Sequence, residues 1–307
     1  MKLCTFVSNR HLRVGSVAGD CVVDLGAAAD ALPKLKGYSD LFHCIECLLY
    51  MPRALGIARK VEKAALAAAS GNRRPGFLLP ISKVKYGPPV PHPPKVLCIG
   101  QNYADHCREQ NVPLPEIPEL FCKFSTSIIG CGDAITLHKA TTKVDYEVEL
   151  AIVIGKRGKN IPKARAYEHV FGYTIFHDVS ARDLQFKSKQ WTRGKSPDTF
   201  APTGPWLVTR DEVPDPHNLA IRTWLNGQLM QDSNTANLVF GVPALVEFLS
   251  QTITLEPGDI IATGTPPGVG CFRKPPVFLK PGDVVRMEIA GLGVLENPVA
   301  AEKRERK

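Results

Sequence analysis

Apolar residues recur at every second position in several short segments of the chain, the pattern of strands that bury one face. The segment 145–154 shows this most clearly, and its alternate apolar side chains from Tyr146 to Ile154 are expected to point into the core. Glu147 and Glu149 then share the opposite face of the same strand. A solvated outer face carrying two glutamates is the alternative interpretation of that pair.

Other segments predict strands, turns and a few helices. The dipeptide Asn226-Gly227 separates two short apolar runs, which is a strong signal for a two-residue β-hairpin. The remaining predictions are strands and turns over residues 1–38, a helical stretch over 39–70 that breaks at Pro52 and ends at Gly71, and a helix at Val242–Gln251. Strands dominate without regular strand–helix alternation, so we expect an α+β fold with a strand-rich core.

A proline-rich stretch suggests how the chain is divided. Five of the eight residues from Gly87 to Pro94 are proline, which neither a helix nor a central strand accommodates. We therefore expect four parts: a small N-terminal domain at 1–87, a linker at 88–95, a catalytic domain at 96–300 and a charged tail at 301–307.

Composition changes this picture little. A chain of 307 residues can bury a full core without disulfides, and its nine cysteines are irregularly spaced, which favours a reducing compartment. We find neither an apolar run long enough to span a membrane nor an evident targeting segment, so no membrane association is expected. The net charge of +8 is dispersed and lacks interleaved aromatic residues, so no nucleic acid partner is expected.

Three carboxylates form the most informative candidate site. Two carboxylates at i, i+2 repel each other unless a cation neutralises them, and Mg²⁺ and Mn²⁺ prefer oxygen ligands. A second predicted strand, Phe171–His177, ends at Asp178, which would supply a third carboxylate. Glu147, Glu149 and Asp178 are therefore the predicted metal ligands. A helix N-cap is the alternative role for Asp178.

Acid–base and substrate-binding groups are predicted nearby. On a helix, His106 and Glu109 lie three positions apart and can touch, so the carboxylate could orient the imidazole as a general base. A His–Glu pair on the surface without a catalytic role is the alternative. The turn after Ile260–Ala262 contains Gly264 and Thr265, whose N–H and hydroxyl groups could hold a substrate carboxylate. The other candidates are the amine of Lys195, which follows a glycine, and Arg182 and Gln185, which share a helix face.

Taken together, these motifs resemble those of the fumarylacetoacetate hydrolase family. The resemblance rests on Asn102–His106, Tyr146–Leu150, His177–Asp183 and Thr263–Pro266, and it extends from about Lys95 to Val299. It implies a strand-rich mixed β-sandwich roll with a small N-terminal domain, usually as a homodimer.

The resemblance also implies roles for individual residues. Glu147, Glu149 and Asp178 would bind Mg²⁺ or Mn²⁺. The catalytic groups would be the His106–Glu109 dyad, on a lid-like helix, and Lys195, whereas Arg182, Gln185, Thr265 and Gly264 would hold the substrate. The resemblance to animal members, which are mitochondrial proteins with a presequence, also implies the mitochondrial matrix if a presequence was removed, and otherwise the cytoplasm.

Several reactions fit such a site. A 2-oxo acid would bind the metal through its carboxylate and 2-oxo oxygen, and the metal and Lys195 would stabilise the enolate formed when a C3 proton leaves. Keto–enol tautomerisation of oxaloacetate is the expected reaction. The alternatives are C–C bond hydrolysis of acylpyruvates or fumarylacetoacetate-like substrates, decarboxylation of oxaloacetate, and metal or metabolite binding without catalysis.

Overall fold

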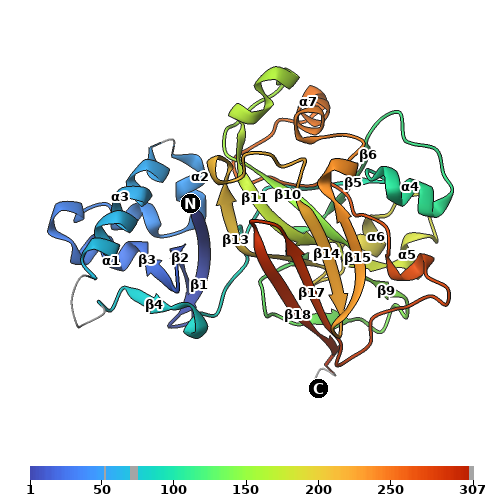
Figure 1. Cartoon of the computed structure of the whole chain (residues 1–307), viewed down its shortest axis with the longest axis horizontal. Helices are drawn as coiled ribbons and strands as arrows, with labels where there is room; N and C mark the ends of the chain where they lie inside the picture. Colours follow the sequence, from blue (N-terminus) through green and yellow to red (C-terminus); the bar gives the residue numbers. More distant parts are fainter. Residues whose placement is uncertain (52, 70–74, 304–307) are drawn as a thin grey trace.

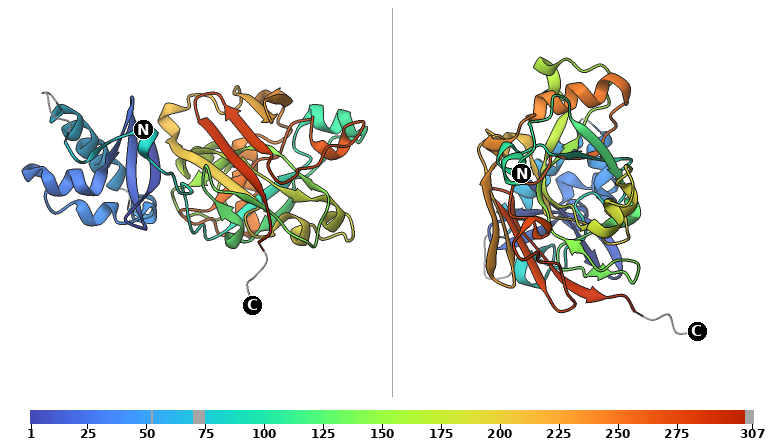
Figure 2. Two further views of the ribbon diagram at one scale, coloured as in Figure 1. Left: turned by 90° about the horizontal axis from the view of Figure 1, so that it is seen from below. Right: turned by 90° about the vertical axis from the view of Figure 1, so that its right-hand side faces the viewer.

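The computed structural model describes residues 1–51, 53–69 and 75–303. The predictions made at Pro52, at Gly71 and for the end of the charged tail lie outside these residues. Figure 1 shows a smaller N-terminal part beside a larger, strand-rich part, and Figure 2 shows the same two parts from below and from the side.

The described elements follow one another in this order. Those of the N-terminal part are β1 (Lys2–Ser8), β2 (His11–Ala18), β3 (Cys21–Asp24), α1 (Leu25–Ala31), α2 (Ile45–Tyr50), α3 (Ala54–Ala67) and β4 (Leu78–Pro80). Then come β5 (Val96–Gly100), α4 (Ala104–Gln110), β6 (Glu119–Lys123), β7 (Ile128–Ile129), β8 (Ile135–Leu137), β9 (Val144–Asp145), β10 (Val148–Ile154), β11 (Val170–His177) and β12 (Ser180–Ala181). The last are α5 (Arg182–Gln185), α6 (Thr192–Lys195), β13 (Ala201–Thr209), β14 (Ala220–Leu225), β15 (Gln228–Asn234), α7 (Val242–Thr252), β16 (Ile260–Ala262), β17 (Val284–Ile289) and β18 (Gly293–Ala301).

Two large sheets organise these strands. The longer sheet has eleven strands in the order β4-β3-β2-β1-β13-β11-β10-β16-β5-β6, with β7 beside β13. The second has five strands in the order β15-β14-β17-β18-β8, and β12 and β9 form a short pair. Most neighbours are antiparallel, with β16–β5, β13–β7 and β18–β8 as parallel pairs. The predicted strand-rich α+β fold is confirmed.

Strand β10 lies in the middle of the long sheet and is buried on both faces. Its side chains from Val148 to Ile154 at even positions join the core that faces the five-stranded sheet, together with residues of β14, β17 and α7. Ala151 and Val153 join a second core that also includes residues of β1 and α1–α3. The face that carries Glu149 is therefore interior, and the solvated-face alternative is wrong.

The N-terminal strands extend the long sheet. Strand β1 pairs with β13 in the register Leu3↔Leu207, so the segment before the proline-rich stretch shares a sheet with the rest of the chain. One prediction for this segment is wrong: Leu25–Ala31 forms helix α1, capped by the side chain of Asp24, instead of strands and turns. The division of the chain into domains stays a prediction.

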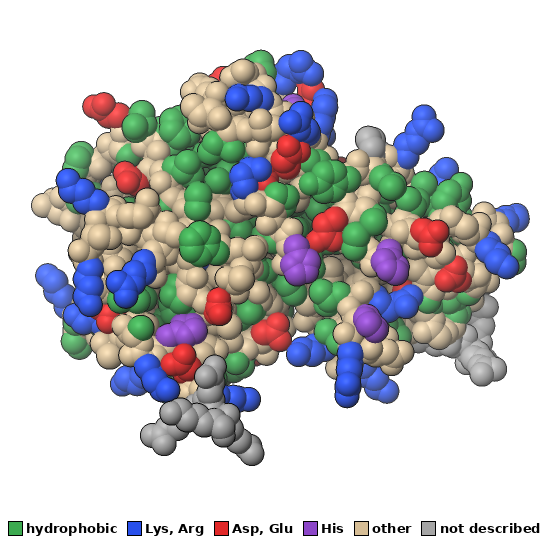
Figure 3. All heavy atoms as spheres, turned by 180° about the vertical axis from the view of Figure 1, so that it is seen from behind, with side chains coloured by type: hydrophobic (Ala, Val, Ile, Leu, Met, Phe, Trp, Pro, Cys, Tyr) green, Lys and Arg blue, Asp and Glu red, His purple; other side chains and the backbone are tan. Residues whose placement is uncertain are grey.

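The surface carries charges of both signs. On the face in Figure 3, lysine and arginine side chains are spread over the molecule with acidic side chains between them. Among the described helices, none is both long enough and apolar enough to cross a membrane.

Candidate active site

Strand pairing brings the three predicted carboxylates together. Glu149 lies on β10, Glu147 directly precedes that strand, and Asp178 directly follows β11. Because Val148 pairs with His177, the antiparallel register sets Glu147 opposite Asp178, and the N–H of Asp178 donates to the carbonyl oxygen of Glu147 at 2.9 Å. One carboxylate oxygen of each residue lies within 4.8 Å of the other two, and all three side chains are buried.

Buried cations surround this cluster. The Lys195 amine donates to Glu147 Oε2 at 2.7 Å and to Asp178 Oδ2 at 2.6 Å. Arg182 donates to Glu147, and also to Asp145 Oδ2 at 2.9 Å. Lysine 123, which is fully buried, donates to the remaining oxygen of Asp178.

The charges of the cluster do not balance. Four buried carboxylates lie among three buried cations, so one negative charge remains; the residues are Asp145, Glu147, Glu149 and Asp178 against Lys123, Arg182 and Lys195.

The carboxylate pKa values show which of these groups lacks a balancing cation. Burial would raise the pKa of Glu147, but Arg182 and Lys195 outweigh it and lower this pKa to about 2. Burial and the charges of Asp178 and Glu147 raise the pKa of Glu149 well above its ordinary value. Glu149 is thus the carboxylate of the cluster that no side-chain cation of the described residues pairs with, and a cluster of oxygen donors with such a member fits a hard divalent cation.

The predicted acid–base pair forms on helix α4. His106 Nδ1 lies 2.9 Å from Glu109 Oε2, one helical turn away, and the imidazole is buried. The other carboxylate oxygen, Glu109 Oε1, accepts the backbone N–H of Gly268 at 2.9 Å, so the Gly-rich turn fixes the pair. His106 lines the cavity described below, and Nδ1 is the ring nitrogen that pairs with Glu109.

The predicted Gly-rich turn approaches the carboxylates from the other side. The N–H of Gly264 donates to Glu149 Oε2 at 2.7 Å, so in this structure it contacts the carboxylate. Gly264 has a φ of +100°, and a Cβ atom there would lie 2.9 Å from Asn102 Cβ, which is why the position requires glycine. Thr265 Oγ1 accepts a hydrogen bond from Gln231 Nε2 at 2.9 Å, which leaves the threonine proton free to be donated.

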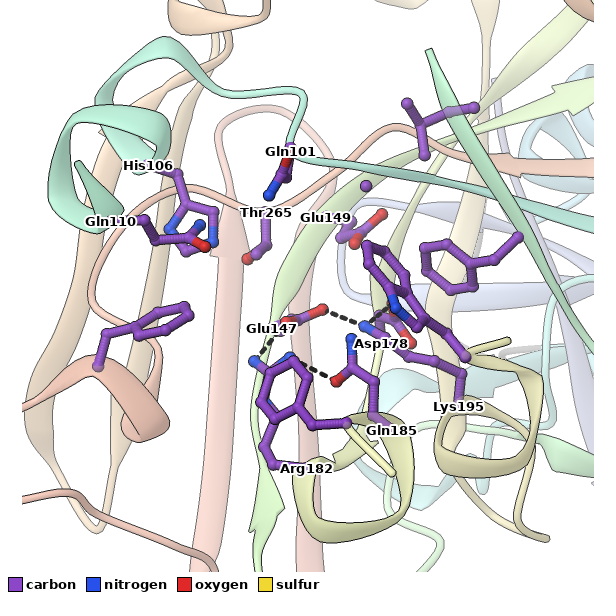
Figure 4. Close-up of a pocket in the computed structure, with 16 residues that line it drawn as sticks. Gln101, His106, Gln110, Glu147, Glu149, Asp178, Arg182, Gln185, Lys195 and Thr265 are labelled. Atoms are coloured by element: carbon purple, nitrogen blue, oxygen red, sulfur yellow. Dashed lines mark hydrogen bonds and ion pairs between the residues drawn. The ribbon is translucent and has the colours of Figure 1, made fainter. Parts of the chain in front are cut away.

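These groups line one small cavity of about 80 Å³ (Figure 4). Aromatic side chains of Phe121, Phe186, Trp191 and Phe272 form much of its remaining wall. Eight of the ten predicted site residues line it: His106, Glu147, Glu149, Asp178, Arg182, Gln185, Lys195 and Thr265. The other two, Glu109 and Gly264, are hydrogen-bonded just behind the wall.

Sequence reasoning missed three polar residues that support the site. Lys123 shares the buried face of β6 with Phe121, and a lysine on the buried face of a strand was the available signal that a carboxylate partner is needed. Asp145, which is fully buried, accepts hydrogen bonds from Arg182 and from the N–H groups of Gly270 and Cys271. Gln231 gave no local signal, because its partners come from β10, β14 and the Gly-rich turn.

Comparisons with known proteins show which sequences and structures this chain is similar to. The family model described as "Fumarylacetoacetate (FAA) hydrolase C-terminal" matches residues 95–300. A curated relative, "Oxaloacetate tautomerase FAHD2B, mitochondrial" of Bos taurus, is 50% identical over 291 residues, which cover 94% of this chain and 87% of that protein.

Solved structures agree with these matches over the whole chain. A fumarylacetoacetate hydrolase from Exiguobacterium antarcticum superposes with a TM-score of 0.79 at 35% identity, covering 98% of this chain and 100% of that one. A maleylpyruvate hydrolase from Sphingobium sp. SYK-6, in complex with manganese(II) and pyruvate, has a TM-score of 0.78 at 31% identity, covering 99% and 100%.

Proposed function

The chain belongs to the fumarylacetoacetate hydrolase family, and from this premise we propose that it is a divalent-metal-dependent oxaloacetate keto–enol tautomerase. The observation that carries the proposal is the cavity shared by the His106–Glu109 dyad and a cluster of three carboxylates. A proton-transfer group and an oxygen-rich cation site within one small cavity are what enolisation of a small 2-oxo acid needs.

Glu147, Glu149 and Asp178 would hold the cation. The excess negative charge of the cluster and the manganese(II) in the related maleylpyruvate hydrolase support a divalent ion, and Mg²⁺ is our proposal for its identity. When bound, such an ion acts as a Lewis acid that polarises substrate oxygens.

The chain's own residues would perform the proton transfer. His106 Nε2 would add or remove the proton at C3, while Glu109 holds the imidazole through Nδ1. Lys195 uses two of its three N–H groups on Glu147 and Asp178, which leaves the third for a substrate oxygen. The free hydroxyl proton of Thr265 provides a further donor. The bulky side chains of Trp191 and Phe272 in the wall would limit access of water.

Tautomerisation is preferred over the other reactions for two reasons. Bovine and human relatives at 50% and 47% identity are named oxaloacetate tautomerases, whereas the two hydrolases compared above are 35% and 31% identical. A cavity of about 80 Å³ also favours oxaloacetate over longer, fumarylacetoacetate-like substrates. A protein that only binds a metal would not need the His106–Glu109 pair, which argues against a non-catalytic role.

The test follows enol-oxaloacetate by ultraviolet absorbance as it converts to the keto form. We expect the wild-type protein to accelerate the decay above the buffer rate in Mg²⁺, and EDTA to remove the acceleration. No pyruvate should accumulate when lactate dehydrogenase and NADH report it in parallel. Pyruvate release from oxaloacetate would indicate the decarboxylase, and turnover of acetylpyruvate alone would indicate the hydrolase.

Location and assembly are further parts of the proposal. The bovine and human relatives carry "mitochondrial" in their names, so we propose the mitochondrial matrix, to be checked by fractionation of cells that produce the full-length protein. We also propose a homodimer, since large apolar side chains such as Ile117, Phe124 and Phe186 are more than half exposed in the single chain. Light scattering after size-exclusion chromatography should give about twice the monomer mass of 33.5 kDa.

A further inference from the structure

Two glutamine side chains line the cavity without a function assigned above. Gln101 lies in the loop between β5 and α4, and Gln110 is the last residue of α4. Both are partly buried, and over the described residues neither side-chain amide has a hydrogen-bond partner. Figure 4 shows both on the same side of the cavity as His106 and Thr265, across from Asp178 and Lys195.

The backbone places both residues at the cavity. Gln110 is four residues after His106, so the two side chains share one face of α4. Gln101 has a φ of +52°, a conformation that glycine or asparagine adopts more readily. The loop is anchored by the next residue, Asn102, whose side chain exchanges hydrogen bonds with Phe240 and Thr263 at 2.8–3.0 Å.

The order of groups along the cavity assigns each a part of the substrate. The carboxylate cluster would lie beside the end of the substrate that carries the 1-carboxylate and the 2-oxo group. His106 would lie beside C3, where the proton is transferred. Gln110, one helical turn beyond His106, and Gln101 therefore face whatever is attached to C3.

We propose that Gln101 and Gln110 bind a second carboxylate, at C4, and thereby select short dicarboxylic 2-oxo acids over those that end in an alkyl group. The inference rests on the proposed function, because it takes C3 to lie beside His106. It goes beyond that function because it names the two residues that determine the substrate class.

The cations of the cavity are held at its carboxylate end, away from the group attached to C3. Arg182 is occupied by Asp145, Glu147 and Gln185, and Lys195 by Glu147 and Asp178. Besides the Thr265 hydroxyl, the side-chain donors on that side of the cavity are these two neutral amides, which donate two N–H groups each. An alkyl end would leave both amides unpaired once the substrate excludes water, and that unmet hydrogen bonding is the source of the selectivity.

The test compares two substrates that differ only at this end. Exchange of the C3 protons for deuterium, followed by NMR in Mg²⁺, reports enolisation of both oxaloacetate and 2-oxobutanoate. We expect the wild-type protein to prefer oxaloacetate in kcat/KM. Gln101→Glu and Gln110→Glu place a negative charge against the C4 carboxylate, and each should lower kcat/KM for oxaloacetate by about 100-fold while changing that for 2-oxobutanoate by less than about 3-fold.

A matched control separates local repulsion from a general change in charge. Gln190 is exposed next to Trp191 and does not line the cavity, so Gln190→Glu should leave both substrates unchanged. Gln101→Leu and Gln110→Leu add no charge. They should lower the ratio of kcat/KM for oxaloacetate to kcat/KM for 2-oxobutanoate, mainly by raising KM for oxaloacetate. The assignment would be overturned if the Gln101 and Gln110 variants lost kcat/KM equally for both substrates, or if the ratio of the two kcat/KM values stayed at the wild-type value.

Binding measurements keep this proposal separate from the proposed function. If wild-type protein exchanges protons of neither substrate, the tautomerase is refuted, and calorimetric dissociation constants for the same two acids in Mg²⁺ then decide the selectivity. Tighter binding of oxaloacetate that Gln101→Glu abolishes would support the carboxylate site, and equal binding of the two acids would refute it.

Discussion

At the scale of single residues, the three clustered carboxylates have unequal sets of partners. Both oxygens of Asp178 accept hydrogen bonds from lysines, and both oxygens of Glu147 are paired with Arg182 or Lys195. In the described part of the chain, the side chain of Glu149 accepts one hydrogen bond, from the N–H of Gly264. Glu149 therefore has the most free capacity for a bound cation.

Removing that carboxylate charge should remove the stabilisation that a metal provides. An ion at about 100 times its dissociation constant adds about 2.7 kcal/mol to the free energy of unfolding. We expect the thermal midpoint of the wild-type protein to rise by several degrees on addition of Mg²⁺ or Mn²⁺, and that of Glu149→Gln to stay constant. Glu116→Gln, at an exposed position away from the cavity, is the control and should respond like wild type. Metal-dependent stabilisation of Glu149→Gln would contradict the ligand assignment.

Replacing the proposed base should separate catalysis from stability. His106→Gln removes the ring nitrogen that would transfer the C3 proton, so kcat for oxaloacetate should fall by about 10²–10⁴-fold with little change in Mg²⁺ affinity. The rate of enol decay and a calorimetric metal titration measure the two effects. His11→Gln makes the same change at an exposed position of β2 and should keep full activity. If His106→Gln turned over oxaloacetate at the wild-type rate, the His106–Glu109 dyad would be excluded from the proton transfer.

At this scale the sequence predicts groups whose partners are close along the chain or repeat with a simple period. Glu147 and Glu149 are two residues apart, and His106 and Glu109 are three apart, so their proximity follows from strand and helix geometry. Lys123 meets Asp178 across 55 residues of sequence. That contact depends on the arrangement of strands, which no local pattern contains.

At the scale of secondary structure elements, Gln231 on β15 connects the two large sheets. Its Oε1 accepts hydrogen bonds from the N–H of Val148 on β10 and from Thr223 Oγ1 on β14. Its Nε2 donates to Thr265 Oγ1 and to the carbonyl oxygen of Pro266. One buried amide thus satisfies four groups and fixes the orientation of the threonine hydroxyl in the cavity.

Substitution of this amide should cost stability. Gln231→Leu leaves buried donors and acceptors of β10, β14 and the Gly-rich turn without partners, at about 1–3 kcal/mol for each such group. The free energy of unfolding from urea titration should therefore fall by more than about 2 kcal/mol. Gln228→Leu, at an exposed position of the same strand, should change it by less than about 0.5 kcal/mol. Similar small effects for both variants would show that the connection is unimportant.

Elements with strong local signals were predicted, and those formed by packing were not. The hairpin of β14 and β15 turns at Asn226 and Gly227, both with positive φ, as the dipeptide indicates. Helix α1 has seven residues, too few for stability in isolation, and forms because Leu25, Ala28 and Ala29 pack into the core shared with β1.

At the scale of the whole molecule, that shared core unites the two parts of the chain. Leu3 on β1 and Leu207 on β13 are fully buried in one apolar cluster with Ala151 and Val153 of the central strand β10. The N-terminal part therefore shares an apolar core with the sheet that carries the site. Loss of this packing should therefore lower the stability of the whole sheet.

Calorimetry can detect such coupling. We expect the full chain to unfold in a single transition, and Leu3→Ala to lower its midpoint as one unit, at a cost of about 2–5 kcal/mol. Leu12→Ala, at a position of β2 that is 40% exposed, should shift the midpoint far less. Two resolved transitions, of which Leu3→Ala moves only one, would show that residues 1–87 unfold independently.

The near-balance of buried charge around the carboxylates has a consequence for how a cell would control this protein. Because Lys123, Arg182 and Lys195 already offset all but one of the four negative charges, the chain can fold and persist without waiting for an ion. Its folding would then not require the metal, although a bound ion would add stability, whereas its turnover would follow the free concentration of the divalent ion. Metal-free protein would already be folded, so an increase in the free metal concentration would activate it by binding alone, without new synthesis.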